Sequence, residues 1–262
     1  MAVMPSTQPA LTRLSQIYRQ QARSRIVLTA YGILKGEAAP PHAVDNIAEL
    51  DPEDDLHFLR AEEPERCAET IVELCRDGIP RWYPQLDKVM DVQVLPPMHK
   101  GAGGTQNLNA VLQGALNPGQ PGVTMGPLRY HRGDKVIQQR NNYDKNLFNG
   151  DLGRITAVNA EAGTIAARFD NETQDFTRSE MTDLALAYAI TIHKSQGSEF
   201  PIVVIPLLKQ HYVMLQRNLL YTAITRGKKK VFLVGDPAAY AMAVRNKDSA
   251  KRITGLGEKL QA

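Results

Sequence analysis

The spacing of apolar residues divides the chain into two kinds of region. Up to residue 126 and again from residue 184, apolar positions recur at helical spacing or form short unbroken runs, as in residues 184–190 and 202–208. Such short runs, the second rich in Val and Ile, are typical of buried parallel strands. Between them, short alternating strands are separated by turn dipeptides such as Asn149-Gly150. The pattern predicts an α/β protein, with helices flanking a parallel sheet that a small all-β insert interrupts.

The same signals give boundaries. The parallel-sheet part is predicted at residues 10–126 and 184–245, the insert at 127–183, and flexible termini at 1–9 and 246–262. Gly36, Gly78 and Gly227 stand where helices are expected to end. The helices are predicted at residues 10–36, 64–76, 105–116, 217–227 and 237–244. The strands are predicted at residues 57–62, 91–95, 135–139, 153–158, 164–169, 174–177, 184–190, 202–208 and 231–234.

Residues 189–200, with the sequence AITIHKSQGSEF, concentrate polar side chains between two predicted strands. In open parallel sheets, ligands bind beyond the carboxyl ends of strands, and this segment is expected at such an end. One interpretation is a ligand site. The other is a polar strand-to-helix turn in which Ser195 is the cap.

Residues 217–227, with the sequence RNLLYTAITRG, are predicted to form a helix whose last turn carries Arg226. A guanidinium there can interact with the negative end of the helix dipole. It can also bind phosphate oxygens through its rigid fork of donors. The sequence leaves both interpretations open.

Two further stretches suggest contact with nucleic acid. Residues 98–105, MHKGAGGT, form a glycine-rich turn before a helix that Thr105 or Asn107 can cap. No GKT or GKS follows, so the turn is no Walker A loop; DNA contact and a plain turn remain open. In the insert, residues 140–143, RNNY, combine cationic, amide and aromatic side chains, which suit a single strand as well as a polar hairpin loop.

Composition adds little to this picture. The 262 residues are 43% hydrophobic, enough for a core, and the net charge of +3 permits a nucleic-acid partner without requiring one. Cys67 and Cys75 have neither CxxC spacing nor a neighbouring histidine cluster. They are interpreted as reduced thiols of a cytoplasmic protein, with no metal site expected. No apolar run reaches membrane-spanning length.

Segments 189–200 and 217–227 together resemble motifs V and VI of superfamily 1 helicases, closest to the RecD-like and TraA-like branch, which includes exodeoxyribonuclease V alpha-like proteins of DNA repair and conjugation. The resemblance covers nearly the whole chain in the family's order. Its other parts are residues 14–20 (LSQIYRQ, motif IV), 95–101 (LPPMHKG), and 140–144 and 148–153 (RNNYD and FNGDLG, from an inserted Src-homology-3-like barrel). Gly227 departs from the Ala usual in the family.

The resemblance implies a RecA-like second motor domain of an ATP-dependent 5′–3′ DNA helicase. Arg19 and Arg226 would contact the γ-phosphate of ATP, and Gln20, Gly197 and Glu199 would lie by the nucleotide. Contacts to single-stranded DNA would come from Thr191, His193, Lys194, Arg140, Asn141, Tyr143, His99 and Lys100. Most contacts to ATP and Mg²⁺ would belong to an N-terminal RecA-like domain that precedes motif IV in the family.

No Walker A or Walker B segment is found in this sequence, so the chain alone is predicted not to hydrolyse ATP. We interpret it as the C-terminal motor half, whether a fragment, a split-gene product or a partial gene. The alternative is a non-catalytic module, derived from a helicase domain, that binds nucleic acid or protein. Retention of both Arg19 and Arg226 favours the motor, because a binding module has no use for that pair.

Overall fold

A computed structural model describes residues 24–247. Its larger sheet has the order β1-β2-β12-β11-β3, and all neighbouring strands are parallel. The long central strands β11 and β12 contain most or all of residues 202–208 and 231–234, which the sequence predicted as strands. The strands are β1 (Ala43–Val44), β2 (Leu56–Arg60), β3 (Val92–Val94), β11 (Phe200–Leu207) and β12 (Gly227–Gly235). We call this sheet and its helices the sheet body.

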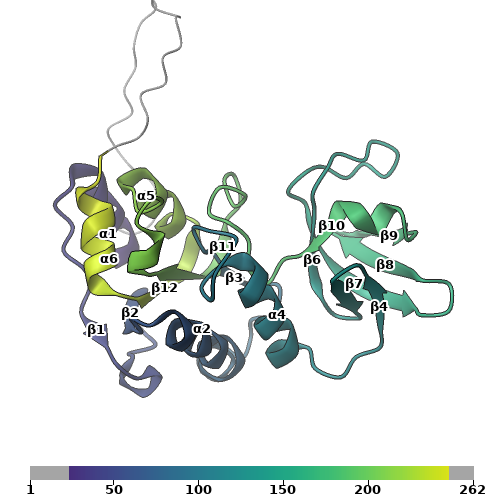
Figure 1. The fold of residues 1–262 in the computed structure, drawn as a ribbon. Coiled ribbons are helices and arrows are strands. Elements are labelled where there is room, and N and C mark those ends of the chain that lie inside the picture. The colour runs from purple at the N-terminus through teal and green to yellow at the C-terminus, as the bar shows by residue number, and fades with distance from the viewer. Residues whose placement is uncertain (1–23, 248–262) are drawn as a thin grey trace, which may run out of the picture.

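Helices cover both faces of the sheet body (Figure 1). One face carries α1 (Arg25–Lys35), α5 (Arg217–Ile224) and α6 (Pro237–Arg245), and the other carries α2 (Pro64–Glu73) and α4 (Thr105–Leu116). Alternate side chains of β11 enter two separate hydrophobic clusters, because successive residues of a strand point to opposite faces. The predicted α/β fold, with helices flanking a parallel sheet, is confirmed.

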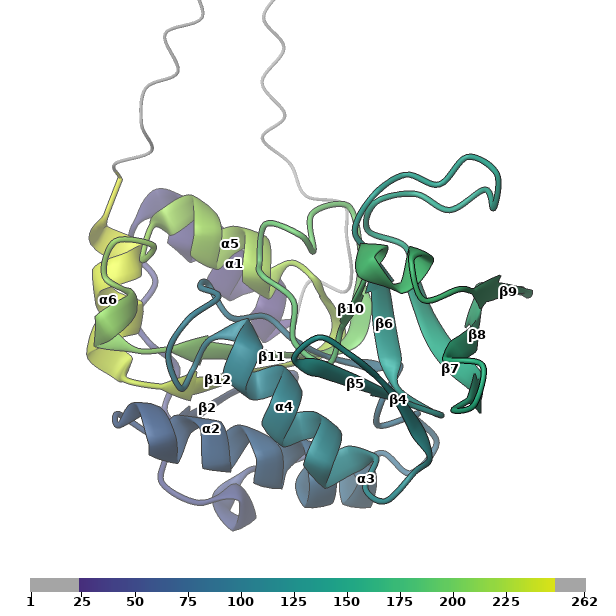
Figure 2. The same ribbon diagram turned by 45° about the vertical axis from the view of Figure 1, so that its right-hand side comes forward.

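The insert lies beside β3 and α4 (Figure 2). Its antiparallel sheet has the order β10-β6-β7-β8-β9, and a separate hairpin joins β4 to β5. The four strands predicted within residues 127–183 are present with boundaries shifted by two residues or fewer, whereas the hairpin at residues 122–131 was not predicted. The strands are β4 (Gly122–Met125), β5 (Leu128–His131), β6 (Lys135–Gln138), β7 (Leu152–Asn159), β8 (Thr164–Phe169), β9 (Glu172–Phe176) and β10 (Leu184–Leu186).

Strand pairing corrects the expectation for residues 184–190. This run does not form one parallel strand: β10 pairs antiparallel with β6, and Ala189 alone makes an isolated parallel bridge to Val94. The run thus leaves the insert's sheet and ends along the edge of the sheet body. Paired strands of the insert extend from Gly122 to Leu186, beyond the predicted limits of 127–183. Apolarity alone does not tell which sheet a strand joins.

Three predicted helix boundaries also need correction. Within the described residues, the first helix begins at Arg25 because Ser24 is its N-cap, so residues 10–36 are not one continuous helix. Gly78 does not end the second helix, since a π-helical turn (Leu74–Gly78) continues it into α3 (Ile79–Trp82). Gly227 is the first residue of β12 rather than a helix cap. The remaining short turns are the 3₁₀ helices η1 (Ile47–Glu49), η3 (Glu180–Asp183) and η4 (Lys209–His211).

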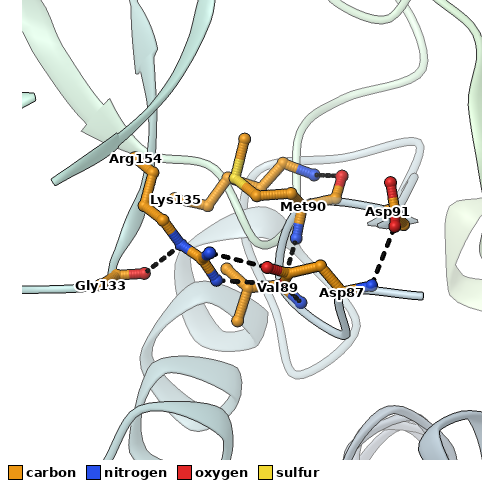
Figure 3. A network of polar contacts seen from close by, with 7 residues as sticks. All are labelled: Asp87, Val89, Met90, Asp91, Gly133, Lys135 and Arg154. Atoms are coloured by element: carbon orange, nitrogen blue, oxygen red, sulfur yellow. Dashed lines mark hydrogen bonds and ion pairs between the residues drawn. The ribbon is translucent and has the colours of Figure 1, made fainter. Parts of the chain in front are cut away.

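Buried polar contacts fix the insert to the sheet body. The Asp134 carboxylate, fully buried, accepts hydrogen bonds from Gln113 of α4, from Asn117 at the C-cap of that helix and from the Tyr188 hydroxyl, at 2.6–2.8 Å. Nearby, the Arg154 guanidinium of β7 binds both carboxylate oxygens of Asp87, at 2.7 and 3.0 Å (Figure 3). The insert is therefore attached through paired charges and hydrogen bonds as well as through apolar packing.

The structure also describes the cysteines, possible metal-binding groups and the lengths of the apolar helices. Cys67 and Cys75 are buried free thiols, and burial raises the pKa of each to about 12. Residues 24–247 hold no group of three His, Cys, Asp or Glu side chains arranged to bind a metal ion. None of the helices in that same range is long and apolar enough to span a bilayer.

Candidate nucleic-acid and nucleotide site

A hollow of about 460 Å³ lies between α4, the insert and the first half of segment 189–200. His99, Thr191 and Lys194, three of the predicted DNA contacts, lie together on its wall. We call this hollow the groove. Its other lining residues are Thr105, Gln106, Asn109, Pro127, Leu128, Ile137, Gln139, Ala185, Leu186, Ala189 and Ile190.

Local hydrogen bonds hold the groove side of segment 189–200 in a tight turn. The Lys194 backbone N–H donates to the Thr191 hydroxyl (3.3 Å), and the buried Ser195 hydroxyl donates to the Ile192 carbonyl (2.7 Å). Ser195 is not a helix cap, because turns lead directly from residue 192 to β11. The Lys194 ammonium points across to the insert, where it donates to Gln139 Oε1 at 3.2 Å. His193 is exposed in the same turn but does not line the groove.

Asn109 of α4 anchors the entry to this segment. Its side-chain amide donates to the Ala189 carbonyl (2.8 Å) and accepts from the Ala189 N–H (2.9 Å), as a neighbouring strand would. Neither Asn109 nor Gln139 was predicted as a groove residue from the sequence. An amide on a helix has no distinguishing spacing, and its partner lies 80 residues away.

The glycine-rich turn is closed by its own backbone. The N–H groups of Gly104, Thr105 and Gln106 donate to the carbonyls of Gly101, Met98 and His99 at 3.0–3.1 Å. A Cβ at Gly104 would lie 2.4 Å from the Lys100 carbonyl oxygen, so this position requires glycine. The N-cap of α4 is Gly104, with no side-chain cap from Thr105 or Asn107. The turn therefore offers a ligand the exposed side chains of His99 and Lys100, not a cradle of backbone amides.

Arg226 lies at the opposite end of segment 189–200. Its guanidinium donates to the Ser198 carbonyl (3.0 Å), the Thr222 carbonyl (3.1 Å) and the Thr225 hydroxyl (3.3 Å). The Phe200 N–H donates to the Arg226 carbonyl at 2.8 Å. Both residues are at the amino ends of β11 and β12, where Phe200 and Gly227 are register partners. The expectation that this segment lies at the carboxyl end of a strand is therefore wrong for its second half.

Gly197 and Glu199 flank Ser198, whose carbonyl accepts a hydrogen bond from Arg226. Glu199 forms an ion pair with Lys228 at 3.8 Å. Gly197 has a left-handed φ of 88°, and a Cβ there would meet no other described atom within 4 Å. The glycine is therefore required by backbone conformation and not by crowding.

The predicted contacts of the insert lie in the loop between β6 and β7, which projects from the insert (Figure 2). Tyr143 is 77% exposed and packs edge-to-face against Phe148 at 6.4 Å. Asn141 donates to the Tyr143 hydroxyl at 3.3 Å, and the exposed Arg140 pairs with Asp183 at 3.6 Å. This loop follows Gln139 directly, so it continues one wall of the groove.

Arg19 and Gln20 lie outside the described residues. The described chain resumes at Ser24, whose hydroxyl donates to Asp55 (2.6 Å), and the Arg25 N–H donates to the same carboxylate (3.1 Å). These two contacts fix the start of α1.

Comparisons with known proteins bear on the family that the motifs resemble. Residues 186–234 match the UvrD-like helicase C-terminal domain, and residues 108–169 match the SH3 domain of ATP-dependent RecD-like DNA helicases. The chain is 36% identical to the ATP-dependent RecD2 DNA helicase of Deinococcus radiodurans over 253 residues, which is 95% of this chain and 32% of that protein. It is also 36% identical to the RecBCD enzyme subunit RecD of Mycolicibacterium smegmatis, over 50% of this chain and 23% of that one.

Among solved structures, one of two coordinating Pif1 helicases unwinding forked double-stranded DNA aligns with a TM-score of 0.52 at 18% identity. It covers 94% of this chain and 55% of that one, and it supports the fold alone. The chain thus spans about a third or less of the curated relatives named above. Together with the order of the motifs, these matches confirm the resemblance to RecD-like superfamily 1 helicases, in which the chain corresponds to the C-terminal half.

Proposed function

We propose that this chain is the C-terminal half of an ATP-dependent 5′–3′ DNA helicase. It supplies an arginine for the γ-phosphate of ATP and part of the track for single-stranded DNA. One observation carries the proposal: the short segment 189–200 lines a groove at Lys194 and contacts Arg226 through Ser198 and Phe200. Two relatives are named as an ATP-dependent DNA helicase and as a subunit of the RecBCD enzyme, which supports this activity.

On the groove side, the proposed contacts are electrostatic. Lys194, Lys100 and Arg140 are exposed cations, and ammonium and guanidinium groups bind phosphate oxygens without reading base sequence. Tyr143 offers a ring on which a base stacks. His99, His193, Thr191 and Asn141 add hydrogen-bonding groups along the same path.

On the nucleotide side, Arg226 is a half-buried guanidinium that fits a phosphate group. Bound ATP would place there the γ-phosphate, on which negative charge develops during transfer to water. Arg226 would stabilise that charge, while Glu199 and Gly197 would lie near the remainder of the nucleotide. Motif IV resemblance assigns the same phosphate to Arg19, with Gln20 beside it.

The described residues fit the phosphate end of ATP but not its metal ion. No acidic or histidine cluster suited to Mg²⁺ is present in residues 24–247. Mg²⁺ is usually held by a few carboxylates together with substrate phosphates. We assign the metal site and the phosphate cradle to an N-terminal RecA-like domain, the partner that this half requires.

The second candidate is a non-catalytic module that binds nucleic acid or protein. What favours it is that the Arg226 guanidinium donates to Ser198, Thr222 and Thr225, as a structural arginine would. The groove, by contrast, is lined by the side chains of predicted DNA contacts. Such a module would use the groove and the Tyr143 loop and leave Arg226 as a structural residue.

Phosphate release measured with and without single-stranded DNA distinguishes the two. The 262-residue chain alone is expected to give no DNA-stimulated hydrolysis, because it has no Walker A loop. The same chain joined to the N-terminal motor domain of its own helicase is expected to hydrolyse ATP in response to DNA. Hydrolysis by the chain alone would refute the assignment of the phosphate cradle to the partner domain. A silent joined protein that still binds DNA would favour the binding module.

A further inference from the structure

Strand β6 of the insert contacts segment 189–200 at both of its ends. Just after its last residue, Gln139 accepts a hydrogen bond from the Lys194 ammonium at the groove. At its first residue, the Lys135 ammonium lies 5.3 Å from the centroid of the Phe200 ring, on the side of Arg226. One short strand of a separate sheet therefore spans the distance between the two proposed ligand sites.

Lys135 is fully buried, which is unusual for lysine. Its side chain leaves the insert and enters the sheet body, where the ammonium donates to the carbonyls of Met90 and Val92 at 3.1 Å each. Figure 3 shows this side chain beside the Arg154–Asp87 pair. The nitrogen is thus held by the edge strand β3 and placed against the first residue of β11.

The surroundings of Lys135 are themselves fixed. Asp87 accepts from the N–H groups of Val89 and Met90 (2.8 and 3.1 Å) and from both terminal nitrogens of Arg154. Asp91 accepts from the Asp87 N–H at 2.8 Å. The loop that presents the Met90 carbonyl to Lys135 therefore cannot shift without breaking several hydrogen bonds at once.

Phe200 connects Lys135 to the nucleotide side. The ring is 5% exposed, and its backbone N–H holds the Arg226 carbonyl at 2.8 Å. Close-packed interiors transmit a displacement of a buried ring to its neighbours. A movement of β6 relative to the sheet body would therefore reach the Arg226 backbone through a single residue.

We propose that β6 is a strut between the two sites, and that Lys135 is a positioning residue. It holds Phe200, and through it Arg226, in register with the groove wall at Gln139 and Lys194. DNA in the groove contacts the Gln139 end of the strut, and the Lys135 end passes the resulting shift to Arg226. Such coupling requires that DNA interact differently with the two positions of the strut. This inference rests on the proposed helicase function.

The test uses the complete helicase with Lys135→Met, which keeps an unbranched apolar side chain and removes the ammonium. Steady-state kcat for ATP is measured without DNA and at saturating single-stranded DNA, together with the Kd for the oligonucleotide. The DNA-stimulated to DNA-free ratio of kcat is expected to fall by at least about fivefold, the lower end of usual coupling between sites. DNA-free kcat and the Kd are expected to stay within about twofold of the parent.

Lys145→Met is the matched control. Lys145 is also a lysine of the insert, pairing with Glu180 at 2.9 Å and lying 4.7 Å from the Phe176 ring, but these partners belong to the insert itself. Its stimulation ratio is expected to match the parent. A general loss of insert stability would lower the ratio in both variants, whereas loss of the strut lowers it in Lys135→Met alone.

A second variant protects the test against misfolding. Phe200→Leu keeps an apolar side chain in β11 and removes the ring that Lys135 faces, and it is expected to lower the same ratio. If Lys135→Met melts below the assay temperature, Phe200→Leu decides. An unchanged ratio in a folded variant refutes the strut. A parent enzyme without any DNA stimulation would instead refute the proposed function.

Discussion

The two ends of segment 189–200 differ in how their functional side chains are held. At the groove end, the exposed Lys194 reaches across a hollow of about 460 Å³ to Gln139 on another sheet. At the nucleotide end, Arg226 is bonded to Ser198, Thr222 and Thr225, all within its own turn or the adjoining one. The side chains at the groove end line a hollow that a ligand can enter. The Arg226 guanidinium, in contrast, is hydrogen-bonded to neighbouring residues.

This difference indicates what each end needs for its proposed role. A guanidinium has five N–H donors, and within the described residues three of those on Arg226 are engaged. Binding a phosphate therefore requires either the remaining donors or the exchange of an internal partner. At the groove no internal hydrogen-bond partner of this kind has to be exchanged, because exposed cationic side chains bind the phosphate backbone of DNA directly. If the proposed function holds, this half should bind DNA without a partner domain, whereas the arginine should act only when a second domain presents a nucleotide.

The largest expected effect is at Arg226. In the complete helicase, Arg226→Ala should lower DNA-stimulated kcat by about 10³-fold or more, the range known for arginine fingers in GTPases. The Kd for single-stranded DNA should stay within about twofold, because the groove lies at the other end of the segment. Phosphate-release kinetics and oligonucleotide titration measure the two quantities.

Two further variants make the Arg226 result specific. Arg226→Lys should restore little activity, because an ammonium lacks the planar fork. Arg66→Ala, which removes an arginine paired at the surface with Glu69 at 3.5 Å, should leave kcat unchanged. Near-parental turnover of Arg226→Ala would mean that this residue only stabilises the end of α5.

The sequence predicted those elements whose signals are local. Gly36 ends α1 in the left-handed conformation, and the Asp236 side chain caps α6 through the Ala238 N–H. The apolar runs of β11 and β12 and the alternating strands of the insert were predicted for the same reason. Motif resemblance then predicted roles for Lys194 and Arg226, which lie at the two ends of one segment.

The remaining features depend on contacts between distant parts of the chain. Residues 184–190 read as one strand but divide between two sheets, because pairing partners such as β6 and Val94 decide the outcome. The position of Arg226 beside Ser198 and Phe200 follows from the register of β12 with β11. Lys135 reads as a strand residue at the start of the insert, and only the packed structure shows its ammonium inside the sheet body.

The next largest effect is expected at Tyr143, on the groove side. If a base stacks on this exposed ring, Tyr143→Ala should weaken single-stranded DNA binding by about 1–3 kcal/mol. Fluorescence anisotropy with the isolated chain measures it, since this end of the segment needs no partner domain. Tyr143→Phe keeps the ring, removes the hydroxyl that Asn141 contacts, and should bind as the parent does. If the parent and both variants bind the oligonucleotide equally, the Tyr143 loop does not contact single-stranded DNA.

A smaller effect, on the pH dependence of stability, is expected from Lys135, which packs against Phe200 at the nucleotide end of the segment. Burial lowers the pKa of this lysine from 10.5 to about 7, opposed by the nearby Asp91 and Asp87 carboxylates and reinforced by Arg154. Between those two pH values the unfolded chain binds one more proton than the folded chain, so the free energy of unfolding should rise with pH there. The gain from pH 7 to 8 should be at most about 1.4 kcal/mol. Urea unfolding at both pH values should show it in the parent and not in Lys135→Met.

The smallest expected effects are in the salt dependence of DNA binding, and they test how far the DNA contacts extend beyond the groove. For a single strand, the slope of log K against log salt is about −0.7 per phosphate neutralised. Lys194→Ala and Arg140→Ala should each make the slope shallower by about that amount in anisotropy titrations of the isolated chain. Arg140 is paired with Asp183 at 3.6 Å and is 80% exposed, so its contact with a phosphate competes with an ion pair that water already weakens. If the slope changes in Lys194→Ala but not in Arg140→Ala, the DNA contacts are limited to the groove. The loop of Arg140 and Tyr143 would then be a surface for a protein partner, and the contrast between the two ends would hold without the insert's loop.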